Sequence, residues 1–381
     1  MNTPKNVANL LQDISAVALA SDDALFSMPP QVYCDEDLLT LERERIFRRD
    51  WVCVGRADEI RDPGDYFTSD LDSVPILVVR QKDGSILALV NVCAHRATIV
   101  ATGTGCARAF VCPYHAWTYA LDGTLLQAPR MGKDFDSAGV GMTQAQLTEW
   151  NGFLFVSLDP DARPLLPRIV SLDHAVADYR IDKMRTLHRE TFIWNCNWKI
   201  LVENGLEAYH INATHTDTLA QVAPVSKVRM VDGPADCFHY TSGLSDSFVP
   251  DKPDPKIAIA NPDIDEARQR EAVVGGIFPS FVFSVSGDWV WWISMQPISA
   301  RSVRVDHGLC GLFDIDQDLI DRNHPNLYFL DLALAFNEED RVRVEAVQRG
   351  AESGLARQSR LSPLEAATKR LAAYLTQSLE N

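Results

Sequence analysis

The sequence of 381 residues lacks the features typical of nucleic-acid-binding, membrane-spanning and dinucleotide-binding proteins. Acidic side chains outnumber basic ones by 52 to 36, so the net charge is −16 and the basic excess typical of nucleic-acid-binding domains is missing. No stretch reaches the roughly 18 apolar residues of a membrane span. The G-x-G-x-x-G dinucleotide fingerprint is also missing. We therefore expect no nucleic-acid partner and no membrane span.

The N-terminal residues do not resemble a secretory signal. Gln12 and Asp13 interrupt the apolar stretch of residues 1–20, which has a single lysine in front of it. The apolar spacing over residues 10–17 predicts a short amphipathic helix instead. We expect a cytoplasmic protein.

Cysteines are too few for a disulfide framework, with eight in a chain of this length. Several stand singly in apolar or mixed surroundings and are expected to be buried free thiols: Cys34, Cys53, Cys196, Cys237 and Cys310. Cys93 and Cys112 differ, because each has a histidine two or three residues further on.

The chain is longer than one hydrophobic core usually serves, so two domains are expected. From Trp51 to about Pro160, short β-rich runs alternate with turn pairs such as Asp83-Gly84, which predicts an all-β domain of hairpins. The predicted strands are 74–80, 86–92, 109–112 and 152–158, then 277–297 and 302–314. The predicted helices are 31–50, 197–210, 328–354 and 361–380. Residues 250–272, rich in Asp, Pro, Lys and Arg, are expected to form a mobile excursion.

The first candidate metal site consists of Cys93-Ala94-His95 and Cys112-Pro113-Tyr114-His115, with sixteen residues between His95 and Cys112. Thiolates and neutral imidazoles are typical ligands of zinc and iron. A structural zinc would take all four on one ion. A Rieske centre would place both cysteines on one iron and both histidines on the other.

The surrounding residues favour iron. NVCAHR (91–96) and CPYHAWTY (112–119) resemble the two cluster loops of Rieske oxygenases and ferredoxins. The resemblance implies that these four residues hold a [2Fe–2S] cluster, which Tyr114 and Trp117 would shield and tune. The family usually has Gly where this chain has Ala116, so the loop must accept a Cβ atom there.

The second candidate site lies in NWKILVENGLEAYHINATH (197–215). On a helix, Glu207 and His210 share a face, whereas His215 lies about 140° from His210. Both histidines can reach one ion only if the helix ends or widens near Asn212-Ala213. The residues alone therefore do not establish joint ligation.

The pattern N-W-K…E-N…E-x-x-H-x-x-x-x-H resembles the mononuclear-iron segment of Rieske oxygenase α subunits. It implies that His210 and His215 bind one Fe(II), with a distant carboxylate completing a two-histidine, one-carboxylate triad. The best match for that carboxylate is Asp340 in FNEEDRVRVEAVQRG (336–350), with Glu338 or Glu339 as the fallback.

A helical projection supports Asp340. An apolar stripe of Phe336, Val344, Val347 and Ala351 includes Asp340, so this side chain should point inward while Glu339 faces water. An inward Asp on an apolar face is costly unless it is paired or bound to a metal.

Glu207 stands where the family has a carboxylate that bridges the two metal centres. That residue is commonly Asp, and some branches that act on quaternary ammonium compounds share the Glu. We interpret Glu203, one helical turn earlier, as a surface acid or one that lies behind the ligands.

The resemblance runs from about Tyr33 to the C-terminal helix and implies an α+β molecule. An all-β Rieske domain (51–162) would be inserted into a helix-grip (SRPBCC, Bet v1-like) catalytic domain (163–381) with a central antiparallel sheet. Residues 1–50 would pack on that catalytic domain as a helical segment. The resemblance further implies a homotrimer, in which the cluster of one subunit serves the iron of its neighbour through Glu207.

The implied activity is that of the terminal oxygenase component of a Rieske system. Electrons from NAD(P)H would arrive through a separate flavin- or ferredoxin-type reductase, and O₂ would hydroxylate a small aromatic or other apolar substrate. The alternative is oxidative N-demethylation or monooxygenation of a quaternary ammonium or N-alkyl compound. An electron-transfer Rieske protein and a zinc-stabilised binding protein are the other classes considered. Phe278, Phe281 and Trp291 are expected in the substrate pocket.

Overall fold

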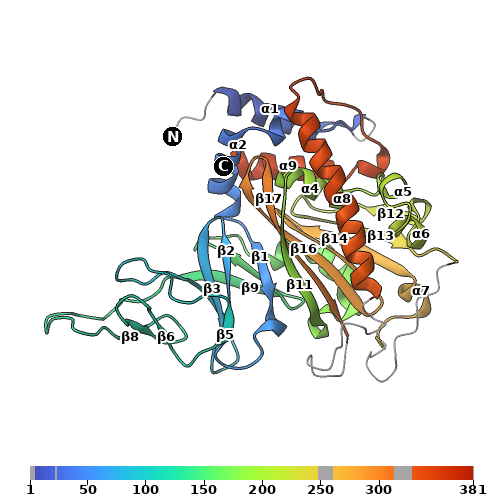
Figure 1. The fold of residues 1–381 in the computed structure, drawn as a ribbon. Helices are drawn as coiled ribbons and strands as arrows, with labels where there is room; N and C mark the ends of the chain where they lie inside the picture. Colours follow the sequence, from blue (N-terminus) through green and yellow to red (C-terminus); the bar gives the residue numbers. More distant parts are fainter. Residues whose placement is uncertain (1–4, 22–23, 248–260, 313–327, 381) are drawn as a thin grey trace. The chain divides into compact units, whose positions relative to one another are not determined.

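The computed structural model describes residues 5–21, 24–247, 261–312 and 328–380 (Figure 1). The chain divides into two compact units. Phe47–Arg163 forms the smaller unit, and Met1–Ile46 forms the larger unit together with Pro164–Asn381. Residues 250–260 of the expected excursion 250–272 lie outside the described residues. Its last part contains the short helix α7 (Glu266–Gln269).

The smaller unit is built mainly from antiparallel strands. One sheet has the order β1-β10-β9-β4-β3-β2-β5, and another has the order β6-β7-β8. The bounds are β1 Val52–Arg56, β2 Asp65–Leu71, β3 Val74–Arg80, β4 Ile86–Val90, β5 Thr104–Cys106, β6 Phe110–Val111, β7 Thr118–Tyr119, β8 Leu125–Gln127, β9 Gln144–Trp150 and β10 Phe153–Ser157.

The strands predicted in this unit are confirmed to within a few residues, because each is an apolar run that ends at a turn. The hairpin between β9 and β10 turns at Asn151 and Gly152, both with positive φ (50° and 80°). Two such residues make the tight turn that matches the twist of a hairpin. The buried core near β6 and β7 includes Phe110, Trp117 and Tyr119.

The larger unit contains an antiparallel sheet of order β11-β17-β16-β15-β14-β13-β12. The bounds are β11 Arg185–Trp194, β12 Val228–Val231, β13 Cys237–Gly243, β14 Glu271–Ile277, β15 Phe281–Ser286, β16 Trp289–Ser299 and β17 Ser302–Gly311. The strand-like stretch 277–297 thus forms most of a hairpin that turns at Gly287-Asp288.

Helices cover this sheet, and Figure 1 shows the long α8 running across one of its faces. The bounds are α1 Lys5–Leu19, α2 Glu36–Glu42, α3 Val170–Val176, α4 Trp198–Leu206, α5 Ile211–Thr214, α6 Leu219–Val222, α8 Tyr328–Glu352 and α9 Thr368–Glu380. The predicted N-terminal helix is α1, which packs against α9. No helix in the described ranges is long and apolar enough to cross a bilayer.

Two helix predictions need correction. Residues 31–50 do not form one helix: a 3₁₀ turn (Pro30–Tyr33) comes first, then α2, then a π-type turn (Arg43–Phe47). The break occurs because the Asp35 carboxylate accepts a hydrogen bond from the Leu38 amide (2.8 Å) and starts a new helix there. In the tail, α9 begins at Thr368 rather than near residue 361.

The Asn-Trp-Lys motif at the start of α4 fixes this helix against its neighbours. The Asn197 side chain caps the helix, and the Asn197 backbone N–H donates a hydrogen bond to Gln348 Oε1 of α8 (2.9 Å). Trp198 Nε1 and Lys199 Nζ both donate to the buried Glu42 carboxylate of α2, at 2.8 and 2.6 Å. Because α4 leads directly into residues 207–215, these contacts set where the second candidate site lies.

Candidate active site

The two loops of the first candidate site share one backbone conformation. In each, the residue four after the cysteine donates to the cysteine carbonyl at 3.0 Å: Ala97 to Cys93, and Ala116 to Cys112. Ala97 and Ala116 are both left-handed, with φ of 57° and 59°. A Cβ atom in that region costs about 1 kcal/mol. The loop therefore accepts Ala116 as the sequence requires, at a conformation that favours glycine.

The four side chains of this site lie together with sulfur on the inside. Cys93 and Cys112 are buried in one cluster, at 3% and 2% exposure, whereas His95 and His115 are exposed. The two histidine rings lie 4.7 Å apart, with their Nδ1 atoms 3.1 Å from each other. Two inner thiols and two outer imidazoles fit the two unlike ends of a Rieske cluster.

Aromatic side chains surround these ligands. Trp117 stacks on His95 (4.8 Å, 7°), and Tyr114 stacks on His115 (3.8 Å, 29°). The Tyr119 hydroxyl lies 3.1 Å from Cys93 Sγ. Burial raises the pKa of the Cys93 thiol, but hydrogen bonds, first among them that of Tyr119, outweigh it and lower the pKa overall. The environment therefore favours the thiolate that a metal requires.

The second site begins where α4 ends. The helix stops at Leu206, and Glu207 is extended (φ −129°, ψ 156°). The predicted helix 197–210 is therefore four residues too long at its end, and the chain breaks before His210 rather than near Asn212-Ala213. The Glu207 carboxylate accepts a hydrogen bond from the His210 backbone N–H (3.2 Å), and the short α5 follows. This early break turns both histidines to the same side.

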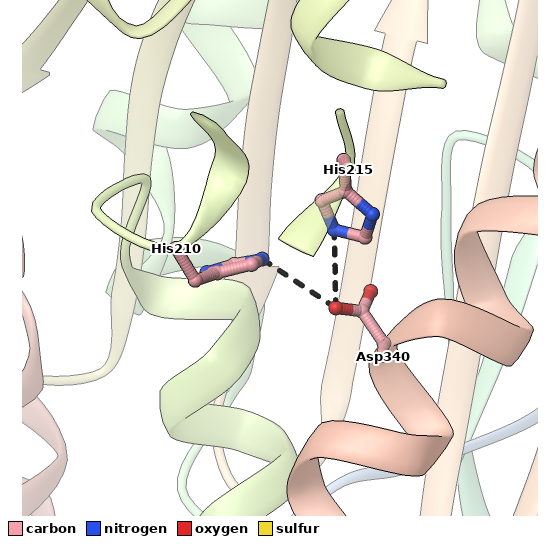
Figure 2. Close-up of side chains that lie close together, drawn as sticks. All are labelled: His210, His215 and Asp340. Atoms are coloured by element: carbon pink, nitrogen blue, oxygen red, sulfur yellow. Dashed lines mark ion pairs between the residues drawn. The ribbon is translucent and has the colours of Figure 1, made fainter. Parts of the chain in front are cut away.

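His210, His215 and Asp340 converge, as Figure 2 shows. Asp340 Oδ1 lies 3.5 Å from His210 Nε2 and 3.1 Å from His215 Nε2. The two imidazole rings are 5.1 Å apart and inclined at 67°. One ligand atom from each of the three residues lies within 4.8 Å of the other two.

The charges around this group favour a cation. Burial lowers the pKa of His210, but the carboxylates of Asp340 and Glu207 outweigh it and raise the pKa to about 10. The same histidines, against burial, lower the pKa of Asp340 to about 2. His215 Nε2 and Asp340 Oδ1 are buried and lack a hydrogen-bond partner in the described chain. Two imidazoles and one carboxylate with unsatisfied atoms fit a mononuclear iron(II).

Each of the two histidines is also held from behind by a carboxylate. Glu207 Oε1 contacts His210 Nδ1, and Glu339 Oε2 lies 2.7 Å from His215 Nδ1. Glu339 also accepts from the Thr218 hydroxyl at 2.6 Å. The expectation that Glu339 faces water is therefore wrong, because the His215 ring contacts Glu339 through Nδ1 as well as Asp340 through Nε2.

The other acids near these ligands have separate places. Glu338, one of the two fallback ligands, is exposed and pairs with Arg341. Glu203 is partly buried rather than a surface acid, and it accepts from the Tyr33 hydroxyl at 2.7 Å. Burial raises the pKa of Glu203 to about 7, although the Tyr33 hydrogen bond and the Lys199 charge act to lower it.

The apolar stripe on α8 differs from the predicted one beyond Val344. Phe336, Asp340 and Val344 are buried as expected, but Val347 is 53% exposed and Gln348 is buried at 2%. The buried positions therefore follow every fourth residue. Gln348 was missed because its burial depends on tertiary contacts: its carbonyl accepts from the Asn197 backbone N–H (2.9 Å), and its Nε2 donates to the Tyr33 carbonyl (3.3 Å).

The candidate metal site formed by His210, His215 and Asp340 opens into a cavity of about 290 Å³ between α8 and the sheet. Side chains alternate along a strand, so Trp291 of β16 and Ser284 of β15 face this cavity. Phe278 and Phe281, also expected here, lie elsewhere. Phe278 packs on Tyr374 of α9, and Phe281 stacks near Phe283 on the other face of the sheet.

Comparison with known proteins defines the family. Residues 50–148 match the Rieske [2Fe-2S] domain, and residues 176–380 match the ring hydroxylating alpha subunit (catalytic domain). The second match spans more than half of the chain, so the protein belongs to the Rieske oxygenase alpha subunits. It is an oxygenase that carries a [2Fe–2S] cluster and a mononuclear iron, and it is neither a simple electron carrier nor a zinc-stabilised binding protein.

The chain is also similar to individual members of this family. The chain is 28% identical to the chloroplastic choline monooxygenase of Beta vulgaris, across 100% of this chain and 82% of that protein. It is 37% identical to the glycine betaine monooxygenase oxygenase subunit of Chromohalobacter salexigens, over 55% of this chain and 47% of that one. The crystal structure of the quaternary ammonium Rieske monooxygenase CntA shares the fold, with a TM-score of 0.81, 24% identity, and coverage of 95% and 98% of the two chains.

Proposed function

We propose that this oxygenase component acts on a small quaternary ammonium compound by monooxygenation or oxidative N-demethylation. The names of the relatives favour this alternative over the hydroxylation of aromatic compounds. The observation that carries the proposal is the combination of aromatic rings and carboxylates around one apolar cavity.

The cavity is suited to a cation. The described residues that line it include Glu207, Asp288 and Asp340, and neither lysine nor arginine is among them. Trp291 and Phe336 lie edge to face, with ring centroids 5.2 Å apart. Aromatic faces attract a quaternary ammonium group without needing a hydrogen-bond acceptor. Because Asp340 is assigned to the iron(II), a positive, poorly hydrated headgroup would be stabilised here by the rings and by the carboxylates of Glu207 and Asp288.

In this proposal, Cys93, His95, Cys112 and His115 would hold the cluster. His210, His215 and Asp340 would hold the iron(II), which supplies O₂ activation when bound. The chain's own side chains prepare that site. Glu207 and Glu339 fix each imidazole with its Nε2 lone pair toward Asp340.

The same proposal extends to partners. A separate reductase would deliver two electrons from NAD(P)H, because the sequence has no dinucleotide fingerprint of its own. One oxygen atom would enter a C–H bond of the substrate, and the other would leave as water. Hydroxylation at an N-methyl carbon would then release formaldehyde. We also propose a homotrimer in which Glu207 connects the cluster of one subunit to the iron of the next.

The test uses the purified holoenzyme with a surrogate reductase. Oxygen uptake and products are measured with choline, glycine betaine and carnitine, and with benzoate and ethylbenzene as the aromatic arm. We expect substrate-dependent uptake and a stoichiometric oxidised product with at least one ammonium compound. Coupled oxidation of the aromatic compounds alone would overturn the proposed substrate class and leave the oxygenase assignment intact.

A further inference from the structure

One row of side chains crosses the sheet where the sheet borders the cavity. Its members are paired residue to residue from β13 to β17, and all of them line the cavity: Tyr240, Val274, Ser284, Trp291 and Leu309. Because directly paired residues of adjacent strands point to the same face, this row presents two hydroxyl groups among apolar side chains.

Both hydroxyl groups of this row can be reached by a bound molecule. Neither Tyr240 nor Ser284 makes a side-chain hydrogen bond within the part of the chain that the structure describes, and neither oxygen is among its enclosed, unpaired polar atoms. Two nearby serines that also line the cavity differ. Ser242 Oγ is enclosed, and Ser286 Oγ donates to the Glu271 carbonyl at 3.3 Å. The cavity wall thus holds two accessible hydroxyls that await a partner.

The Tyr240 hydroxyl lies toward the candidate metal site. Burial, followed by the charges of Glu207 and Asp340, raises the pKa of Tyr240 far above its usual value. These two carboxylates can act on the phenol oxygen only if that end of the side chain lies on their side of the cavity, since Coulomb interactions weaken with distance. The hydroxyl keeps its proton, so it is available as a hydrogen-bond donor beside the site.

Ser284 lies beside the aromatic rings of the cavity. It is directly opposite Trp291, whose ring is 5.2 Å from that of Phe336. The Phe336 ring in turn lies 6.2 Å from the ring of His215. Directly opposite residues have Cβ atoms about 5 Å apart. A cation held against these rings would therefore place an oxygen atom a few bonds from its nitrogen next to the Ser284 hydroxyl.

The charges of the cavity indicate what kind of oxygen fits. Its described lining includes carboxylates, among them Glu207 and Asp288, and contains neither lysine nor arginine. An anionic oxygen buried beside these acids would be repelled and would lack a counter-ion. The hydroxyl group of an alcohol accepts hydrogen bonds without that cost.

We propose that the Tyr240 and Ser284 hydroxyls together donate hydrogen bonds to a hydroxyl oxygen of the substrate. The inference rests on the proposed function. It narrows the substrate to quaternary ammonium compounds that carry a hydroxyl group a few bonds from the nitrogen. The rings of Trp291 and Phe336 would hold the cationic end of the molecule, and the two hydroxyls would hold its oxygen.

The experiment measures binding, independently of turnover. Choline and propyltrimethylammonium differ by a hydroxyl in place of a methyl group of similar size. Their dissociation constants for the anaerobic holoenzyme are determined by calorimetry, in the native protein and in Tyr240→Phe and Ser284→Ala, each of which removes one oxygen atom. We expect the preference for choline to fall by about 3- to 10-fold in each variant, the value of one hydrogen bond.

Ser286→Ala is the matched control. It removes a hydroxyl from the same strand and the same cavity, but one that already donates to the Glu271 carbonyl. Its preference for choline should equal that of the native protein.

A preference for choline that is unchanged in either Tyr240→Phe or Ser284→Ala would overturn the proposed pair of donors. If a variant lost its cluster absorption, Tyr240 would be replaced by 4-fluorophenylalanine or Ser284 by cysteine, which keep the shape and donate poorly or not at all. If neither ammonium compound bound, the proposed function would fail on its own. Benzyl alcohol and ethylbenzene would then serve as the matched pair. A selectivity for the alcohol that both variants reduce would support the donor role, and equal binding would refute it.

Discussion

Three consecutive acids of α8 have three different surroundings. Glu338 is exposed and pairs with Arg341, Glu339 accepts from His215 Nδ1, and Asp340 faces Nε2 of the same ring. One helical position therefore separates a surface ion pair from a group that orients a ligand. A carboxylate on the far nitrogen of a metal-binding histidine fixes its tautomer and raises its basicity.

At this scale we predict that Glu339→Ala lowers iron(II) affinity at the mononuclear site by about 10- to 100-fold, because His215 loses its orienting partner. The measurement is competition of the protein with a coloured chelator for ferrous iron. The cluster absorption should stay unchanged.

Glu338→Ala is the matched control, since it removes the adjacent acid without touching His215. It should bind iron as the native protein does. Equal iron affinity in Glu339→Ala and Glu338→Ala would show that Glu339 does not position the ligand.

The sequence indicated His210, His215 and Asp340, because their spacing resembles a known ligand pattern. It named Glu339 only as a fallback ligand and could not indicate the contact of Glu339 with His215 Nδ1. A helical projection turns residue 339 about 100° away from Asp340, and only the tertiary position of His215 and Thr218 places a proton donor there. The prediction that Phe278 and Phe281 line the substrate pocket was wrong for a related reason. Composition suggested an aromatic pocket, but the alternation of side chains along each strand decides which rings face the cavity.

At the scale of elements, the contact of α4 with α2 determines where the second site lies. Lys199 is 1% exposed and bonds to Glu42, which is fully buried. Trp198 donates to the same carboxylate. Since α4 leads into Glu207 and the two histidines, this buried pair positions the segment that carries the ligands.

We predict that Glu42→Ala lowers the free energy of unfolding by about 3–5 kcal/mol, because Lys199 would be left buried and unpaired. Denaturant unfolding of the holoenzyme, followed by circular dichroism, measures this. Glu44→Ala, an exposed acid in the next turn, should change the free energy by less than about 0.5 kcal/mol.

The double variant Glu42→Leu with Lys199→Met removes both charges and should recover most of the loss. If Glu42→Ala were as mild as Glu44→Ala, the buried pair would not determine the stability of α4.

Strands that are apolar runs could be predicted from the sequence, whereas the more polar strands β9 and β11 could not. β3 and β10 are apolar runs bounded by turn residues, so their periodicity and limits appear in the sequence itself. The end of α4 at Leu206 could not be found in the same way. Residues 197–210 have a continuous helical pattern, and the break depends on Glu207 turning back to the amide of His210.

At the scale of the whole molecule, the chain joins two kinds of metal chemistry. The smaller unit gathers two thiols and two imidazoles, and the larger unit gathers two imidazoles and a carboxylate. Each arrangement draws on residues far apart in sequence: sixteen residues separate the two motifs of the first, and Asp340 joins the second from α8. The cluster can supply electrons to oxygenation within this protein only if the second site binds iron.

The most direct test of this account is therefore the iron content and spectrum of the purified protein beside its His210→Ala variant. The native protein should contain about three iron atoms per chain, two in the cluster and one at the mononuclear site. His210→Ala should retain about two, keep the electron paramagnetic resonance signal of the reduced cluster, and lose substrate-dependent oxygen uptake. Substrate oxidation that survived in His210→Ala, or an iron content that did not fall, would contradict the account.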